Sequence, residues 1–531
     1  MIEITLEAII LLLVVASVVA VVVKYVHLPY TIALVIVGAL IGIFGTFSGL
    51  ELSKALILTV FLPPILFEGA LAMDLDHLRE NLRPVGVLAF FGTLISAFAV
   101  GAGAHYLLDL DWTLALLFGV IIAPTDPVSV IALFRELGLR RLGTIVAGES
   151  IFNDGLAVVL FGILIAVVEG EELGVLDAFS DFLYVIAVGA FLGLAFGYLA
   201  YRILGHIDDH LIEAVITLAL AYGVFLLAET VDASGVIAVV LAGLIIGNYG
   251  RVFSMSPTTR VHLTSFWDTI VFIANSLLFL LIGIALAAAE IAVRPALFRI
   301  AVAIPLAVVG RALAVYPLLT LLNLGRDRIP ASWWPVVFWG GLRGSIPVAL
   351  VLGIGAIGVS RDVSDTLLTT VFGVVLFSLV VQGLTMKPLV RRLKLGAGAT
   401  AEQAQAYEYE EAVGQEQALI AAIHELDAMR GRGEISDRTF TALKQRYEEA
   451  LANVSQEIDQ LQIQHEVIET EREYAERRVL FARRAALRSA LERGVISEAV
   501  YKKLRTEIDR ELENTEGRSS AEPATGDPPR D

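Results

Sequence analysis

Long apolar stretches separated by short polar loops fill the chain up to position 398, and a strongly charged pattern follows. A helix needs roughly 20 apolar residues to cross the ~30 Å hydrocarbon core of a bilayer. Thirteen stretches have about this length, near 6–23, 30–46, 55–73, 84–106, 112–134, 143–167, 177–203, 211–228, 233–248, 262–288, 295–323, 332–357 and 363–386. This pattern predicts an all-α polytopic membrane domain over residues 1–395 with 13 transmembrane helices.

The charged residues of the loops predict how this domain is oriented. Fifteen Lys and Arg residues lie in one alternate set of loops, whereas the opposite set holds three, Lys54, Arg294 and Arg361. Basic residues concentrate in cytoplasmic loops, so we expect the N-terminus outside the cell membrane and the C-terminal region in the cytoplasm. The first stretch begins without a basic segment or a cleavage site, which favours a retained helix over a signal peptide.

Composition narrows the class of protein further. Hydrophobic residues make up 56% of the chain, charged residues 18%, and the mean hydropathy is +0.75. A net charge of −17 argues against a nucleic-acid partner, which would have to be met by a basic surface. The absence of cysteine excludes disulfides, thiolate metal sites and cysteine nucleophiles.

Ionisable residues inside the predicted spans are the first candidates for function, because charge at bilayer depth is costly unless it is paired or hydrated. They are Glu68, Asp126, Glu149, Asp154, Arg311 and Arg343. Ser150 and Asp154 share a face of the span 143–167, with Asn153 beside them. Hydroxyl, amide and carboxylate oxygens are hard donors that suit a small alkali cation. A buried polar cluster that bridges helices is the alternative.

Two predicted spans carry residues that interrupt a helix. Pro124 and Pro127 bracket Thr125 and Asp126, and glycines at 340, 341 and 344 with a proline at 347 surround Arg343. Proline removes a backbone donor, so the helix should unwind and free carbonyl groups that can bind a cation. Interrupted helices in separate halves of a chain are typical of transporters built from inverted repeats with a site at the midplane. A pair of ordinary proline kinks is the alternative.

These segments carry a resemblance to a known family. TDPVSV, ESIFND followed by GLAVVLF, FWDTIVFIANSLLFLLIG and GGLRGSIPVAL resemble the hallmark segments of electroneutral NhaP/NHE-type sodium/proton antiporters, the monovalent cation:proton antiporter 1 family. The likeness covers residues ~1–395. It implies an NhaA-like fold, with a dimerisation domain and an ion-translocating core whose two unwound helices cross in the membrane. It also implies a homodimer that is not an enzyme and uses no cofactor, and that exchanges Na⁺ for H⁺ across the lipid bilayer, with Li⁺ and K⁺ as alternative cations.

The resemblance also implies roles for individual residues. Asp154, Ser150, the Thr125 backbone and Glu68 would bind Na⁺, and Asp126 would join through water. Arg343 would pair with Glu68 and Asn153 to hold the core together, while Glu149 is a candidate for the cytoplasmic access path. Electrogenic relatives carry a second aspartate at the position of Asn153, so a single carboxylate here implies 1:1 exchange that serves pH and sodium homeostasis.

The charged region predicts a cytoplasmic helical domain over 399–516 and a disordered tail over 517–531. This region holds 46 of the 95 charged residues. RGEISDRTFTALKQRYEEAL, from position 432, matches RGVISEAVYKKLRTEIDREL, from position 493. The match indicates two helix-turn-helix repeats, at about 417–451 and 478–512. A regulatory module is one interpretation and an inert appendage is the other; its ligand is not indicated.

Two classes of function are consistent with the sequence. The first is a secondary sodium/proton antiporter. The second is a transport-inactive, channel-like or sensor-like membrane protein of the same fold that signals through its cytoplasmic region. The intact residues at 125, 126, 153, 154 and 343 favour the first.

Overall fold

The computed structural model of the chain describes residues 6–26, 30–44, 56–127, 130–131, 133–134, 137–170, 174–207, 209–255, 257–288, 293–325, 328–354, 359–395, 401–431 and 436–463, and the single positions 483, 487, 500, 501, 503, 504 and 508. The chain divides into two compact units, Met1–Ala397 and Gly398–Asp531. Every element that is assigned within the described ranges is helical.

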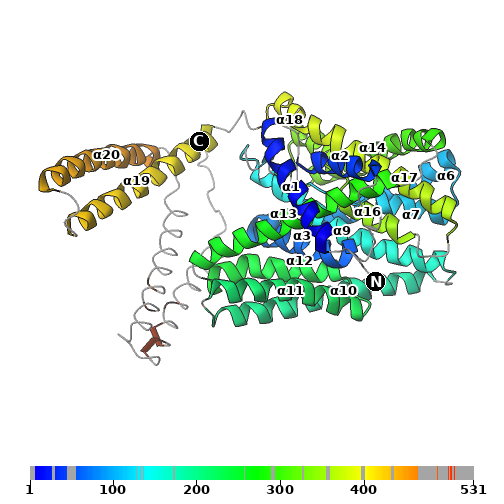
Figure 1. Ribbon diagram of the computed structural model, residues 1–531, viewed down its shortest axis with the longest axis horizontal. Coiled ribbons are helices and arrows are strands. Elements are labelled where there is room, and N and C mark those ends of the chain that lie inside the picture. Colours follow the sequence, from blue (N-terminus) through cyan, green and yellow to red (C-terminus); the bar gives the residue numbers. More distant parts are fainter. Residues whose placement is uncertain are drawn as a thin grey trace, which may run out of the picture. The chain divides into compact units, whose positions relative to one another are not determined.

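The first unit is a bundle of helices that lie side by side, with α10, α11 and α12 together along one flank (Figure 1). Its helices are α1 (Leu6–Val26), α2 (Tyr30–Ile43), α3 (Leu62–Leu71), α4 (Leu75–Glu80), α5 (Leu82–Val87), α6 (Thr93–Leu108), α7 (Trp112–Ile122), α9 (Arg140–Val168), α10 (Val175–Leu204), α11 (His210–Thr230), α12 (Gly235–Ile245), α13 (Pro257–Ala288), α14 (Val293–Asn323), α15 (Trp334–Trp339), α16 (Ser345–Ile354), α17 (Arg361–Phe377) and α18 (Gly383–Arg392). Short π-helical segments are η1 (Leu56–Phe61), η2 (Leu88–Gly92), η3 (Ile246–Ser254) and η5 (Ser378–Gln382), and η4 (Ala331–Trp333) is a 3₁₀ turn.

The lengths of these helices follow the apolar pattern of the sequence. Among the described residues, eight helices are long and apolar enough to cross a membrane, and five shorter apolar helices occur as well. Each of them overlaps with one predicted stretch, and several extend a few residues beyond its predicted ends. The prediction of a polytopic all-α domain is therefore confirmed, while 13 complete crossings stay a prediction.

Small residues allow some of these helices to pack with their backbones in contact. Gly38 of α2 faces Gly283 of α13, and a Cβ atom at Gly38 would lie 2.2 Å from the carbonyl oxygen of Leu280. A Cβ atom at Gly283 would lie 2.3 Å from the carbonyl oxygen of Val35. Only glycine leaves room for the neighbouring backbone at both positions. Close contact between helix backbones favours helix association in a membrane, where the hydrophobic effect does not drive helices together. The contact with α2 fixes the position of α13, which forms one side of the candidate site.

The second unit contains a helical hairpin of α19 (Ala401–Gly431) and α20 (Asp437–Ile463). Lys444 Nζ lies 3.0 Å from Asp427 Oδ1, and the Arg430 guanidinium lies 4.5 Å from the centre of the Phe440 ring. At the start of α20 the Ser436 hydroxyl accepts a hydrogen bond from the Thr439 amide, as an N-capping serine does. The hairpin includes the described positions of the first predicted repeat, 417–451, while the second repeat lies outside the described residues except for single positions. The organisation into two repeats stays a prediction.

Candidate functional site

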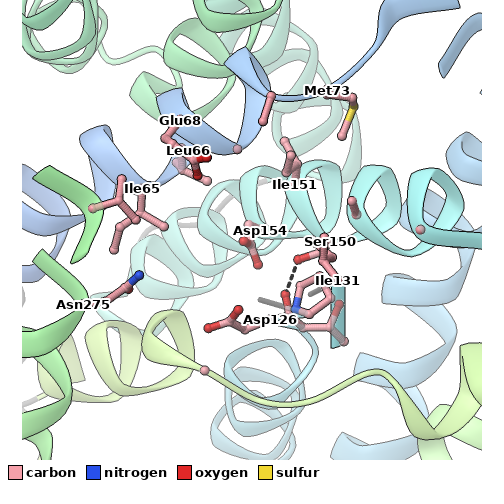
Figure 2. Close-up of a pocket in the computed structure, with 18 of the residues that line it drawn as sticks. Ile65, Leu66, Glu68, Met73, Asp126, Ile131, Ser150, Ile151, Asp154 and Asn275 are labelled. Carbon is pink, nitrogen blue, oxygen red and sulfur yellow. Dashed lines mark hydrogen bonds between the residues drawn. The ribbon is translucent and has the colours of Figure 1, made fainter. Parts of the chain in front are cut away.

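A cavity of about 630 Å³ lies between two walls of the first unit (Figure 2). The first wall consists of α9, the segment 124–127 and the segment 344–347. The second wall, called here the α3–α13 wall, consists of α3 with the residues up to Asp74 and the part of α13 from Asp268 to Asn275. Arg140, Thr144 and His77 also line the cavity at the end where α9 begins.

Two interrupted helices cross beside this cavity, as their prolines and glycines predict. α7 ends at Ile122 and residues 123–127 are not helical; α15 ends at Trp339 and α16 begins only at Ser345. The two breaks touch, since the Asp126 amide donates to the Leu342 carbonyl at 2.7 Å. A Cβ atom at Gly344 would lie 2.1 Å from Asp126 Oδ2, so any larger residue at 344 would displace the Asp126 carboxylate. We call residues 123–127 and 340–344 the crossing.

α9 holds the first break in place through two polar side chains. The Asn153 amide nitrogen donates to Thr125 Oγ1 at 2.8 Å, and Asn153 Oδ1 accepts from the Thr125 amide at 3.3 Å. The Ser150 hydroxyl donates to the Thr125 carbonyl at 2.5 Å. Thr125, Ser150 and Asn153 are all at least 97% buried. Groups that the broken helix leaves without partners are thus satisfied by the neighbouring helix, as buried backbone requires.

Asp154 is the residue of this cluster that remains incompletely bonded. Its side chain lines the cavity, is 8% exposed, and has an Oδ1 atom that is buried without a hydrogen-bond donor among the described residues. Figure 2 shows Asp154 directed toward the same space as Asp126. A buried carboxylate oxygen with no donor is costly, and binding a proton or a cation removes that cost.

All five residues expected to bind the cation line this one cavity: Asp154, Ser150, Thr125, Asp126 and Glu68. Glu68 comes from α3 and therefore lies on the wall opposite Asp154. Asp126 and Glu68 are each partly exposed to the cavity. Residues from three separated parts of the chain thus meet around a space large enough for a hydrated cation.

Arg343 takes partners other than the expected ones. Its Nη1 donates to the carbonyl of Ala123 at 2.8 Å and to that of Pro124 at 3.1 Å, and its amide donates to Ser378 Oγ. The bonds to the two carbonyls have a simple cause: the broken helix offers carbonyls without donors, and the 97% buried Arg343 side chain lies against them. The implied pairing of Arg343 with Glu68 and Asn153 stays a prediction.

Glu149 has a buried partner that the sequence did not indicate. It is 1% exposed, forms an ion pair with the two terminal nitrogens of the Arg311 guanidinium on α14, and does not belong to the described cavity lining. The structure therefore places Glu149 in a buried ion pair, and its role in the access path stays a prediction. Arg311 Nη2 donates in addition to the Val337 carbonyl at 3.1 Å. The pair ties α9 and α14 to the second interrupted helix.

The sequence did not predict several further polar residues of the cavity as ligands, among them Asp268, Asn275 and Ser345. Asp268 and Asn275 lie seven positions apart on α13, two helical turns, so they share the face that meets the cavity. This seven-residue spacing was the feature of the sequence that could have indicated a shared polar face. It did not identify one, because Asp268 stands close to the beginning of the predicted span 262–288.

The fold and the site together define a multi-pass membrane transporter with a polar crossing of two interrupted helices. The family model for the transmembrane part of sodium/hydrogen exchangers matches residues 10–392. The chain therefore belongs to the sodium/hydrogen exchanger family, as its motifs indicate.

Relatives across most of the chain agree with this assignment. The Na⁺/H⁺ antiporter NhaG of Bacillus atrophaeus is 37% identical over 493 residues, which cover 89% of this chain and 90% of that protein. The Na⁺/H⁺ antiporter ApNhaP of Aphanothece halophytica is 40% identical over 427 residues, 79% of each chain. The solved structure of the sodium proton antiporter MjNhaP1 from Methanocaldococcus jannaschii superposes with a TM-score of 0.59 at 22% identity, covering 73% of this chain and 98% of that one. This last similarity supports the fold alone.

Proposed function

We propose that this protein exchanges one Na⁺ for one H⁺ across the cell membrane and that Asp154 carries the two ions in turn. Membership of the sodium/hydrogen exchanger family gives the class of transport. The observation that carries the proposal is the buried Asp154 Oδ1, which has no donor in the described part of the chain and belongs to a residue that lines the cavity at the crossing. The relatives supply no support for a transport-inactive sensor or channel.

The chemistry of exchange follows from the surroundings of Asp154. Burial disfavours a bare carboxylate, whereas a proton or a bound cation neutralises it, so the two ions compete for one group. Ser150 Oγ, the Thr125 carbonyl and the Glu68 carboxylate are the oxygen ligands that would complete a Na⁺ site. Because the ions compete, lowering the pH should raise the Na⁺ concentration needed for half-maximal exchange.

The stoichiometry depends on Asn153. Its amide is bonded at both ends to Thr125 and so holds the broken helix. An amide, unlike a carboxylate, does not titrate. Asp154 is then the α9 group in this cluster that can alternate between charged and neutral forms. One proton leaves as one sodium enters, and the cycle moves no net charge.

Alternating access requires one wall of the cavity to move against the other. We propose that the interrupted helices and α9 move together, since Asn153, Ser150 and Arg343 tie them into one group, while the α3–α13 wall belongs to a dimerisation scaffold. The change of state would be permitted only when Asp154 is neutralised. Two chains would form a homodimer with the N-terminus outside and the helical unit after 398 in the cytoplasm, where it regulates exchange.

A transport assay tests the proposal directly. The purified protein is reconstituted into liposomes that contain a pH-sensitive dye, an inward-acid gradient is imposed, and Na⁺ is added outside. The proposal predicts proton efflux that depends on Na⁺ and saturates with it. A channel or sensor would give no cation-dependent efflux, and that result would refute the proposed function. Parallel additions of Li⁺ and K⁺ define the cation range.

A further inference from the structure

Asn275 differs from the other asparagines of the transmembrane unit in its hydrogen bonding. Each of the other four has an amide bonded at both ends, to backbone or to a neighbouring side chain, as seen at Asn81, Asn153, Asn248 and Asn323. Within the described part of the chain, the Asn275 side chain forms no hydrogen bond with another residue. Four asparagines therefore hold the fold together, and the fifth does not.

The place of Asn275 explains where its polar atoms are satisfied. It is half-buried on α13 and lines the cavity, and its neighbours on the α3–α13 wall include the apolar residues Ile65, Leu66, Val271 and Phe272. Figure 2 shows the Asn275 side chain directed from α13 into the cavity, on the side opposite Ser150. An amide in a largely apolar wall needs a polar partner. Inside the cavity, water or the transported ion would supply that partner.

We propose that Asn275 is a specificity-determining residue that offers its side-chain oxygen to the partly hydrated alkali cation bound in the cavity. The inference rests on the proposed function, since it assigns a further ligand to the same site. An amide oxygen is a hard, neutral donor that suits Na⁺ and Li⁺. Because it does not titrate, it strengthens cation binding without adding a second proton site, so the 1:1 stoichiometry is preserved.

The position on the opposite wall gives this ligand a distinct role. Ser150 and Asp154 belong to one helix, so their oxygens keep a fixed separation whatever the cation. Asn275 reaches the same cavity from α13, and its distance from Asp154 depends on how the two walls are spaced. Cations that differ in radius and hydration should therefore respond differently to its removal. Selectivity is expected to change together with affinity.

Ser276 supplies a matched control on the same helix. Its hydroxyl donates to the Phe272 carbonyl and lies 2.8 Å from the Tyr30 hydroxyl. It is fully buried and is not part of the cavity lining. Ser276→Ala thus removes one polar group from the adjacent position of α13 while leaving the cavity unchanged.

The test compares the wild type, Asn275→Ala, Asn275→Ser and Ser276→Ala in proteoliposomes, with exchange measured against Na⁺, Li⁺ and K⁺ concentration at fixed pH. Loss of one ligand oxygen should raise the apparent KM of Asn275→Ala for Na⁺ about three- to ten-fold and leave its maximal rate within about two-fold. The ratio of the Na⁺ and Li⁺ KM values should change, and Asn275→Ser should recover part of the affinity. Ser276→Ala should keep the wild-type KM values.

Two results would overturn the inference. One is an Asn275→Ala protein whose KM values and cation ratio equal those of the wild type. The other is an equal loss of maximal rate for all cations with lowered thermal stability, which would show a structural role. Failure of the proposed function looks different, because the wild type and Ser276→Ala would then show no exchange.

Discussion

Glu149 and Asp154 are two buried carboxylates five positions apart on α9, yet their surroundings are opposite. Both oxygens of Glu149 are bonded to the Arg311 guanidinium, and the residue is not part of the described cavity lining. Asp154 lines the cavity and has one oxygen without a donor among the residues that the structure describes. A paired buried carboxylate stays charged and stabilises the arrangement of helices around it. A carboxylate without a partner can be neutralised by whichever ion reaches it, and exchange needs that property.

The largest expected effect is on transport and comes from Asp154→Asn. The amide keeps the size of the side chain and removes the one charge that alternates between proton and cation. Na⁺-dependent proton efflux from proteoliposomes should fall to the level of empty liposomes, while the midpoint of thermal unfolding in detergent stays equal to or above that of the wild type. Wild-type exchange in this variant would contradict the assignment of Asp154.

The Glu149–Arg311 pair should show the reverse pattern. Glu149→Gln leaves the 5% exposed guanidinium of Arg311 without its counter-charge, and breaking a buried pair costs about 3–5 kcal/mol of stability. The melting temperature in detergent should fall clearly, and the protein that remains folded should still exchange Na⁺ for H⁺.

The double variant Glu149→Leu with Arg311→Met controls for this loss, since replacing a whole buried pair with apolar residues is often neutral. Its melting temperature should lie above that of Glu149→Gln. If the double variant is less stable than Glu149→Gln, the ion pair stabilises the fold by more than the neutralisation of its own two charges. A Glu149→Gln protein that is as stable as the wild type but does not exchange Na⁺ for H⁺ would show that Glu149 takes part in transport, as Asp154 is proposed to do.

These contrasts could be predicted from the sequence only in part. The prolines at 124 and 127 and the glycines around Arg343 identify both helix breaks, because their effect on backbone geometry is local. The partners of Glu149 and Arg343 could not be derived in the same way. Arg311 is 162 positions from Glu149, and Arg343 bonds carbonyls about 220 positions away. Such pairings depend on how the helices pack, and the apolar pattern of each span does not encode that.

Asn275 illustrates the same limit. The sequence shows Asn275 only as a polar residue within an apolar span, and several other positions share this feature. Its difference from Asn153 or Asn248 becomes visible only when every hydrogen-bond partner is known. The family motifs indicated the proposed cation ligands of the first wall, and the structure added polar residues such as Asn275 that face them across the cavity.

The smallest effect is expected from removing the charged region after Gly398. Every proposed cation ligand belongs to the unit Met1–Ala397, so a truncated chain should still insert and exchange. A regulatory unit that binds one state of the transporter better than the other should alter the apparent Na⁺ affinity or the pH profile about five-fold. Unchanged Na⁺ and pH dependence would leave the unit without a regulatory role, and a folded but inactive truncation would make it essential.

In the proposed cycle, Asp154 alone exchanges its proton for one cation while Asn153 stays neutral. Proteoliposomes clamped with K⁺ and valinomycin at several potentials test this most directly, because each elementary charge moved is worth about 2.3 kcal/mol per 100 mV. We expect the Na⁺ and H⁺ gradients at which net flux stops to be the same at every potential. A null point that shifts with voltage would show that charge accompanies the cycle and would contradict one-for-one exchange at Asp154.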